Sequence, residues 1–88
     1  MAFIQLKTEI PGPKAKELLE RKETSVPKGP FNTIKTFAVK GDGALLTDVD
    51  GNTFLDFAGA IGSLNTGHCP KRVIEALHKQ IDSYLHPC

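Results

Sequence analysis

Apolar residues recur at helical spacing in two stretches of the chain, one near its beginning and one near its end. The first stretch opens at Pro13, whose fixed φ suits the first turn of a helix, and closes before Pro27, because a residue that precedes proline avoids the helical conformation. The spacing predicts a short helix over about residues 13–25 and an amphipathic helix over about residues 70–85. The apolar face of the first helix is thin and consists of Ala15, Leu18 and Leu19. The apolar stripe of the second consists of Val73, Ile74, Leu77, Ile81, Tyr84 and Leu85.

Between these stretches, over about residues 35–57, apolar and polar residues alternate as they do in β-strands. Gly41-Asp42-Gly43 is typical of a tight connection, and Asp50-Gly51 is a dipeptide that accepts the positive φ values of a type I′ turn. The pattern predicts a three-stranded antiparallel meander, which needs a packed face to be stable. The predicted fold class is therefore α+β, with one helix on each side of the meander in sequence.

Residues 58–68 are predicted to form a glycine-rich loop between the meander and the second helix. So many small residues suit neither a strand nor a right-handed helix, and glycines are tolerated best where the backbone conformation or a close neighbour requires them. A mobile loop is the alternative interpretation. The stretch from Gly62 to Gly67 resembles a phosphate-binding loop, but it lacks the Lys and Ser/Thr that would reach the phosphates and Mg²⁺.

Length and charge exclude several classes of function. Eighty-eight residues form at most one small domain, and a formal net charge of +1 gives no electrostatic reason to bind nucleic acid or an anionic membrane. No stretch approaches the ~20 apolar residues of a membrane span, and the first residues do not form a signal peptide. Cys69 and Cys88 could form one disulfide at most. We therefore expect a soluble cytoplasmic protein.

The chemically active side chains form no complete catalytic or metal-binding set. Asp48 is expected on the exposed face of a strand or beside a turn, Asp50 is explained by its turn, and Asp56 is expected to cap nearby backbone N–H groups. His68 is expected to be a loop or helix-start residue that caps backbone groups, and His78 is expected to be solvated. The histidines and cysteines match no zinc-site spacing. No lysine has the apolar neighbours that a Schiff-base lysine requires.

The stretch GALLTDVDGNTFLDFAGAIG, residues 43–62, continues to LNTGH at residues 64–68 and closely resembles the opening of class III pyridoxal-phosphate aminotransferases. Within that class, three further motifs are most similar to 4-aminobutyrate aminotransferases, so the resemblance covers the chain from Thr8 onward. These motifs are Pro11-Gly12-Pro13, Leu18-Leu19-Glu20-Arg21 and Val26-Pro27-Lys28-Gly29.

This resemblance implies that residues 1–88 are the N-terminal segment of a much longer homodimeric enzyme of the fold type I class. Such an enzyme uses pyridoxal 5′-phosphate to move an amino group from an ω-amino acid, such as 4-aminobutyrate, to a 2-oxo acid, 2-oxoglutarate. The cofactor lysine would lie in the absent large domain, so the 88 residues alone are expected to be inactive.

The resemblance also assigns Ile61 and Gly62 to the substrate site, since the family places isoleucine at the first of these positions in 4-aminobutyrate enzymes and tyrosine in ornithine enzymes. A branched apolar wall packs well on the methylenes of an aliphatic substrate. Ornithine or acetylornithine remains an alternative substrate. The chain departs from the family at Cys69-Pro70, where proline comes one position early.

Two readings from other classes stay open. One is a small free-standing α+β binding module without catalysis, although a thin first helix and a loop of small side chains provide little apolar burial to offset the conformational entropy lost on folding. The other is a truncated gene product without function.

Overall fold

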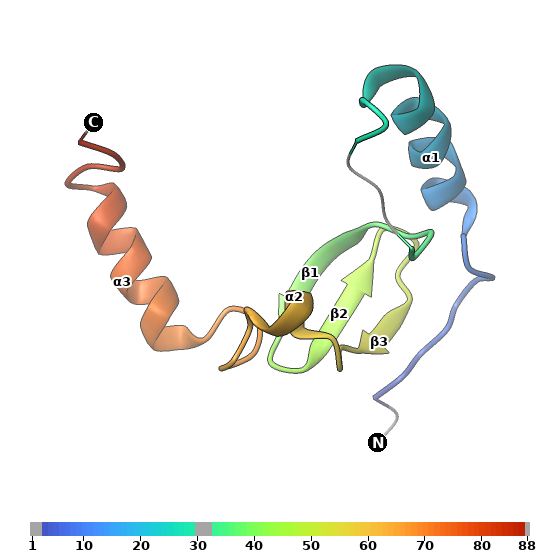
Figure 1. Ribbon diagram of the computed structural model, residues 1–88. Helices are drawn as coiled ribbons and strands as arrows, with labels where there is room; N and C mark the ends of the chain where they lie inside the picture. Colours follow the sequence, from blue (N-terminus) through green and yellow to red (C-terminus); the bar gives the residue numbers. More distant parts are fainter. Residues whose placement is uncertain (1–2, 30–32, 88) are drawn as a thin grey trace.

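The computed structural model describes residues 3–29 and 33–87, and it confirms the predicted α+β class. A three-stranded antiparallel sheet in the order β1-β2-β3 lies between two longer helices, which project from different sides of it (Figure 1). The elements are α1 (Pro13–Ser25), β1 (Ala38–Asp42), β2 (Leu45–Asp48), β3 (Thr53–Leu55), α2 (Gly59–Gly62) and α3 (Lys71–Ile81).

The β1–β2 connection lies later in the chain than the predicted Gly41-Asp42-Gly43. β1 continues to Asp42, which pairs with Leu45, so the connection to β2 consists of Gly43 and Ala44. Gly43 has a φ of 57°, which a two-residue hairpin connection requires and glycine adopts without strain. On the other edge, the N-terminal segment pairs with β3 through reciprocal backbone hydrogen bonds between Gln5 and Thr53.

The β2–β3 connection is not the predicted type I′ turn. Gly51 has a φ of 83°, but Asp50 does not adopt the positive φ that a type I′ turn also requires. The loop instead consists of residues 49–51, because Asp48 N–H donates to Asn52 O (2.9 Å) and so pairs these two residues. A hydrogen bond from Gly51 N–H to Asp48 O (3.0 Å) lies within the loop. The Asp48 carboxylate explains the difference, because it accepts the N–H groups of Asp50 and Asn52 and holds the start of the loop in the ordinary φ region.

The most buried residues of the sheet are polar. Asn52 is fully buried and Asp48 is only 2% exposed. Of the two placements expected for Asp48, the one beside the turn is confirmed and the one on an exposed strand face was wrong. Asn52 Oδ1 accepts the backbone N–H groups of Lys7 (2.6 Å) and Thr8 (2.9 Å), while its Nδ2 donates to Thr8 Oγ1 (2.8 Å) and Asp48 Oδ2 (3.0 Å). Every polar atom of the Asn52 side chain is thus satisfied, and together they fasten the N-terminal segment to the hairpin.

Asp50 has a second function, which its turn position did not reveal. Its carboxylate oxygens accept the N–H groups of Lys14 (2.8 Å) and Ala15 (2.9 Å) in the first turn of α1. A carboxylate there satisfies two free donors and interacts favourably with the positive end of the helix dipole. A Cβ atom on Gly12 would lie 2.5 Å from Asp50 Cγ, so glycine is required at this contact.

The buried Asp48 should make folding stability depend on pH. Burial disfavours its charged form, but hydrogen bonds from Asn52, Thr36 and the backbone of Asp50 outweigh that effect and lower the pKa of Asp48. A lowered folded-state pKa stabilises the fold above the ordinary aspartate value of about 3.9, and this contribution is lost as the pH falls through the folded value. In a full-length enzyme that carries this segment, we expect the free energy of local opening at residues 47–53, measured by hydrogen exchange, to fall between pH 5 and pH 3. Asp48→Asn should weaken that dependence, and an unchanged pH profile would contradict the assignment.

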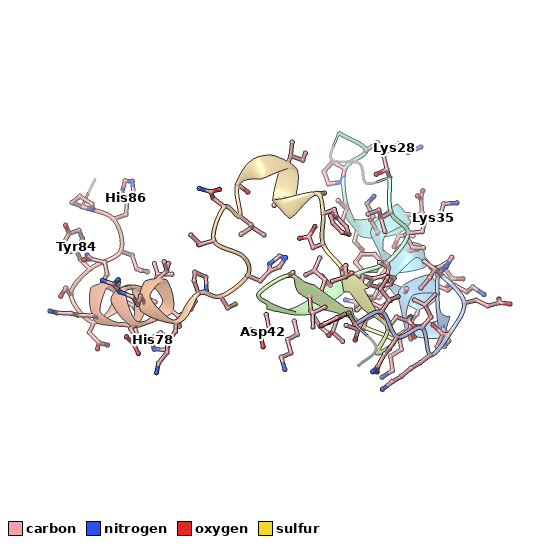
Figure 2. All side chains as sticks on the ribbon, turned by 90° about the horizontal axis from the view of Figure 1, so that it is seen from below. Lys28, Lys35, Asp42, His78, Tyr84 and His86 are labelled. Atoms are coloured by element: carbon pink, nitrogen blue, oxygen red, sulfur yellow. The ribbon has the colours of Figure 1, made fainter. Side chains whose placement is uncertain are left out.

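α3 is shorter than predicted and packs against no other helix or strand in the part of the chain that the structure describes. Pro70 is its N-cap rather than its first residue, and the helix ends at Ile81 because the N–H groups of Ser83 and Tyr84 both turn back to Gln80 O. Tyr84 and Leu85 therefore lie beyond the helix. Figure 2 shows His78, Tyr84 and His86 at the far end of the molecule from Lys28 and Lys35.

The apolar stripe of α3 remains about half exposed, as Val73 (49%), Leu77 (50%) and Ile81 (57%) show. The accessible surface of 7457 Å² exceeds the roughly 5,100 Å² of a compact protein of this mass. The radius of gyration, 15.8 Å, likewise exceeds the roughly 12 Å of a compact domain of 88 residues. These values disfavour a free-standing module. None of the described helices is long and apolar enough to cross a membrane.

Candidate functional site

The predicted glycine-rich loop over residues 58–68 contains one left-handed turn, α2. The φ angles are 55° at Gly59, 51° at Ala60, 58° at Ile61 and 84° at Gly62. A left-handed conformation costs a non-glycine residue roughly 1–2 kcal/mol, and for a β-branched residue such as isoleucine it is a genuine outlier. Such strain persists only where surrounding contacts impose it, and strained residues occur most often at functional sites.

Hydrogen bonds to both ends of the turn impose this conformation. Asp56 Oδ1 accepts the Gly59 N–H at 2.9 Å, which confirms the expectation that Asp56 caps backbone groups. At the other end, Ser63 Oγ donates to Ala60 O (2.9 Å), and Leu64 N–H donates to Gly59 O (3.0 Å). The turn is therefore held by its own backbone and by one carboxylate from the end of β3.

The second oxygen of Asp56 meets His68, a pairing that the sequence reasoning missed. His68 Nε2 and Asp56 Oδ2 are 2.7 Å apart, and their side chains are only 17% and 10% exposed. The Gly59 N–H and the His68 contact lower the pKa of Asp56. The available signal was an aspartate between two apolar residues at a strand end, but only the fold brings a histidine twelve residues later to it.

His68 is itself fixed on the β1–β2 hairpin. Its backbone exchanges two hydrogen bonds with Gly43, of 2.8 and 3.0 Å, and its ring packs so closely on Gly41 that a Cβ there would lie 2.7 Å from His68 Cγ. Gly67 also needs to be glycine, since a Cβ would lie 2.9 Å from Gly43 O. The predicted close approach to the glycine-rich loop thus occurs at Gly67.

A cavity of about 320 Å³ opens beside the Asp56–His68 pair, but Ile61 and Gly62 do not line it. Ile61 lies instead on the outer surface of the turn, where it is 99% exposed. No described atom lies within 4 Å of a Cβ added to Gly62, so its glycine is explained by its positive φ. The turn therefore presents an apolar side chain and an open backbone to whatever faces it.

The backbone directly before the early proline adopts a positive φ. Cys69 has a φ of 50°, after which Pro70 caps α3, while His68 keeps both bonds to Gly43. Cys88, the other half of the one conceivable disulfide, lies outside the described residues. Within the described ranges, no three His, Cys, Asp or Glu side chains are grouped to hold a metal ion.

Comparison with known proteins identifies the family of this fold. The family model for class III aminotransferases matches residues 27–88, which include the whole sheet, the left-handed turn and α3. The chain belongs to the class III aminotransferases. This aminotransferase segment thus has the family that its strand and glycine motifs predicted.

The relatives of this aminotransferase segment are much longer than the chain. It is 47% identical over 68 residues to the probable 4-aminobutyrate aminotransferase of Bacillus subtilis (strain 168), covering 77% of the chain and 16% of that protein. It is 37% identical over 84 residues to the 4-aminobutyrate aminotransferase of Mycobacterium leprae (strain TN), covering 96% of the chain and 19% of that protein. The chain thus spans less than a fifth of the length of these relatives.

A solved structure agrees with the fold of this aminotransferase segment. The ornithine aminotransferase of Toxoplasma gondii matches with a TM-score of 0.72 and 30% identity, over 78% of this chain and 16% of that one. That structure is described as having partial occupancy of pyridoxal phosphate at its active site, in agreement with the dependence of class III aminotransferases on this cofactor.

The lysines of this chain do not have the burial that a covalent cofactor lysine requires. A lysine that binds pyridoxal phosphate covalently needs burial to become nucleophilic at neutral pH. All nine lysines lie in the described ranges and none is buried; Lys22 is partly covered and the others are exposed.

Proposed function

We propose that this chain is the N-terminal segment of a pyridoxal-phosphate-dependent aminotransferase that moves an amino group from an ω-amino acid, such as 4-aminobutyrate, to 2-oxoglutarate. In this proposal the segment lines the substrate pocket and contributes to the contact of a homodimer. The observation that carries the proposal is the left-handed turn, which displays the strained and fully exposed Ile61 on its outer surface.

The chemistry of Ile61 suits an aliphatic substrate. A β-branched side chain is stiff, so it forms a wall of defined shape against methylene groups. Gly62 follows it without a side chain, which leaves room for the substrate or for another part of the enzyme. The 4-aminobutyrate names of the two reported relatives support the same substrate class.

The proposal separates the work of this segment from that of the cofactor. When bound in the full enzyme, pyridoxal phosphate would supply the chemistry of amino-group transfer, and the lysine that binds it covalently would lie outside these 88 residues. Ile61 and Gly62 bind and orient the amino donor and help to exclude water from it. The exposed stripe of α3 and the large accessible surface support burial of this segment against the rest of the enzyme or its partner subunit.

An exchange enzyme tests this function. In it, the 88-residue chain replaces the segment that it matches in the Bacillus subtilis relative, and the unaltered relative serves as the positive control. We expect turnover of 4-aminobutyrate with 2-oxoglutarate, and a stronger preference for 4-aminobutyrate than for ornithine. An exchange enzyme that is folded and loaded with cofactor but inactive on every ω-amino acid would contradict the proposal. A preference for ornithine or acetylornithine would mean that this amino acid, and not 4-aminobutyrate, is the amino donor.

Ile61→Tyr should alter the substrate preference of the exchange enzyme. A bulkier and polar-tipped side chain removes the space for the methylenes, so kcat/KM for 4-aminobutyrate should fall about tenfold or more. The fall for ornithine should be smaller. Val39→Tyr is the matched control, because Val39 is a β-branched residue on β1 that is also exposed, at 64%. Equal effects of the two substitutions on the preference would exclude Ile61 from the substrate site.

A further inference from the structure

We propose that Asp56 is a positioning residue that sets where the turn presents Ile61 to the substrate. One carboxylate oxygen binds the first residue of the turn, Gly59, and the other binds His68. The inference rests on the proposed function, because it assigns a role to the support of Ile61. Asp56 itself touches no substrate in this scheme and is not a catalytic residue.

The first step concerns the fixed side of the contact. Asp56 follows β3 directly, and its own N–H donates to Ala44 O at 2.8 Å. The carboxylate is therefore attached to the sheet at the β1–β2 connection. The two hydrogen bonds between Gly43 and His68 hold the far end of the loop to the same hairpin. Through its contacts with Gly59 and His68, Asp56 thus links the beginning and the end of the loop beside the β1–β2 connection.

The second step concerns the turn. The bonds from Gly62 N–H to Ala58 O (3.2 Å) and from Leu64 N–H to Gly59 O (3.0 Å) lie within the loop and preserve its shape. The hydrogen bond from the Gly59 N–H to the Asp56 carboxylate ties the entry of the turn to the end of the strand. Loss of the carboxylate should therefore let the turn move as a unit, with its internal bonds intact, and displace Ile61 from the substrate.

The third step concerns His68. Its ring is confined by Gly41, and its Nε2 faces Asp56 at 2.7 Å. The ring therefore holds the carboxylate in the orientation that leaves the other oxygen for the Gly59 N–H. Asp56 and His68 form one unit, in which the histidine orients the aspartate and the aspartate holds the turn. A side chain that keeps a donor at the Nε2 position should preserve this unit.

The exchange enzyme provides the test, with Asp56→Ala as the main variant. We expect KM for 4-aminobutyrate to rise about tenfold with a smaller change in kcat, and the preference for 4-aminobutyrate over 5-aminovalerate to fall at least about fivefold. Hydrogen exchange of residues 57–66 should accelerate about tenfold, while that of the hairpin over residues 40–48 stays unchanged. His68→Gln should retain the wild-type preference, because its amide can donate to the carboxylate, whereas His68→Ala should not.

Asp42→Asn is the matched control, since Asp42 is exposed on β1 and projects from the ribbon away from the turn (Figure 2). The inference would be overturned if Asp56→Ala changed neither the preference for 4-aminobutyrate over 5-aminovalerate nor the hydrogen exchange of residues 57–66. Acceleration that extends through the hairpin would also overturn it, because Asp56 would then act on the stability of the whole fold. An inactive exchange enzyme would refute the proposed function alone, and the exchange measurement on residues 57–66 would still decide the role of Asp56.

Discussion

Asn52→Leu should open the junction between the N-terminal segment and the β2–β3 hairpin, with hydrogen exchange there accelerated about a hundredfold. Leucine has nearly the same shape but leaves the N–H groups of Lys7 and Thr8 and the Asp48 carboxylate without their buried partner. Each unsatisfied buried group costs about 1–3 kcal/mol, so the local free energy of opening should fall by about 3 kcal/mol or more. This loss corresponds to a hundredfold change or more, since 1.4 kcal/mol is a factor of about ten.

Hydrogen–deuterium exchange measures this effect in the enzyme that carries the exchanged segment, on peptides that cover residues 5–12 and 47–53. Asn65→Leu is the control, because Asn65 is exposed in the loop before α3 and the same substitution there buries no unsatisfied group. Equal exchange in the two variants would show that the buried amide does not hold the junction together.

Gly67→Ala should separate His68 from the β1–β2 hairpin. The new Cβ would lie 2.9 Å from Gly43 O and 3.2 Å from Gly43 C, and these backbone atoms cannot move without breaking both Gly43–His68 hydrogen bonds. The positive φ of 84° adds roughly 1–2 kcal/mol and the overpacking about 1–3 kcal/mol, so the contact should lose about 2–5 kcal/mol. Hydrogen exchange of residues 40–46 and 66–70 in the exchange enzyme reports the loss.

Gly62→Ala provides a precise comparison for this prediction. Gly62 has the same φ of 84°, but no described atom lies within 4 Å of the position of its Cβ. Both variants therefore bear the conformational cost, and only Gly67→Ala bears the clash. We expect a difference of about 1–3 kcal/mol between their local exchange free energies. No difference would mean that Gly67 is required for its φ alone.

The local features of the fold could be predicted because they depend on neighbours in the sequence. Proline fixes the start of α1 at Pro13, alternation defines the meander, and apolar spacing defines α3. The prediction was wrong where hydrogen bonds between residues at most four positions apart set the turn type or the helix end, because the alternation and spacing patterns do not report such bonds. The Asp50-Gly51 loop has a different turn type because the Asp48 carboxylate binds its N–H groups, and α3 ends before Tyr84 because its last turn tightens at Gln80.

The candidate site could be predicted only as a stretch of residues. The resemblance placed Ile61 and Gly62 in it, and the expectation that Asp56 binds nearby N–H groups was correct. The pairing with His68 was not foreseen, because twelve residues separate the two side chains and no periodic pattern relates them. Nor does the sequence reveal that Ile61 adopts a left-handed conformation, since isoleucine by itself strongly avoids it.

The sequence by itself determined the family, the α+β class and the order of the elements, since these depend on motifs, periodicity and the restricted φ of proline and glycine. Only the tertiary structure decided which polar groups meet. It brings Asp50 to the first turn of α1, some 35 residues earlier in the chain, and buries Asn52 against the N-terminal segment. It also joins Asp56 to His68 beneath the turn. The physical reason is that an unpaired buried polar group is costly, so each finds its partner through the packing of the whole chain.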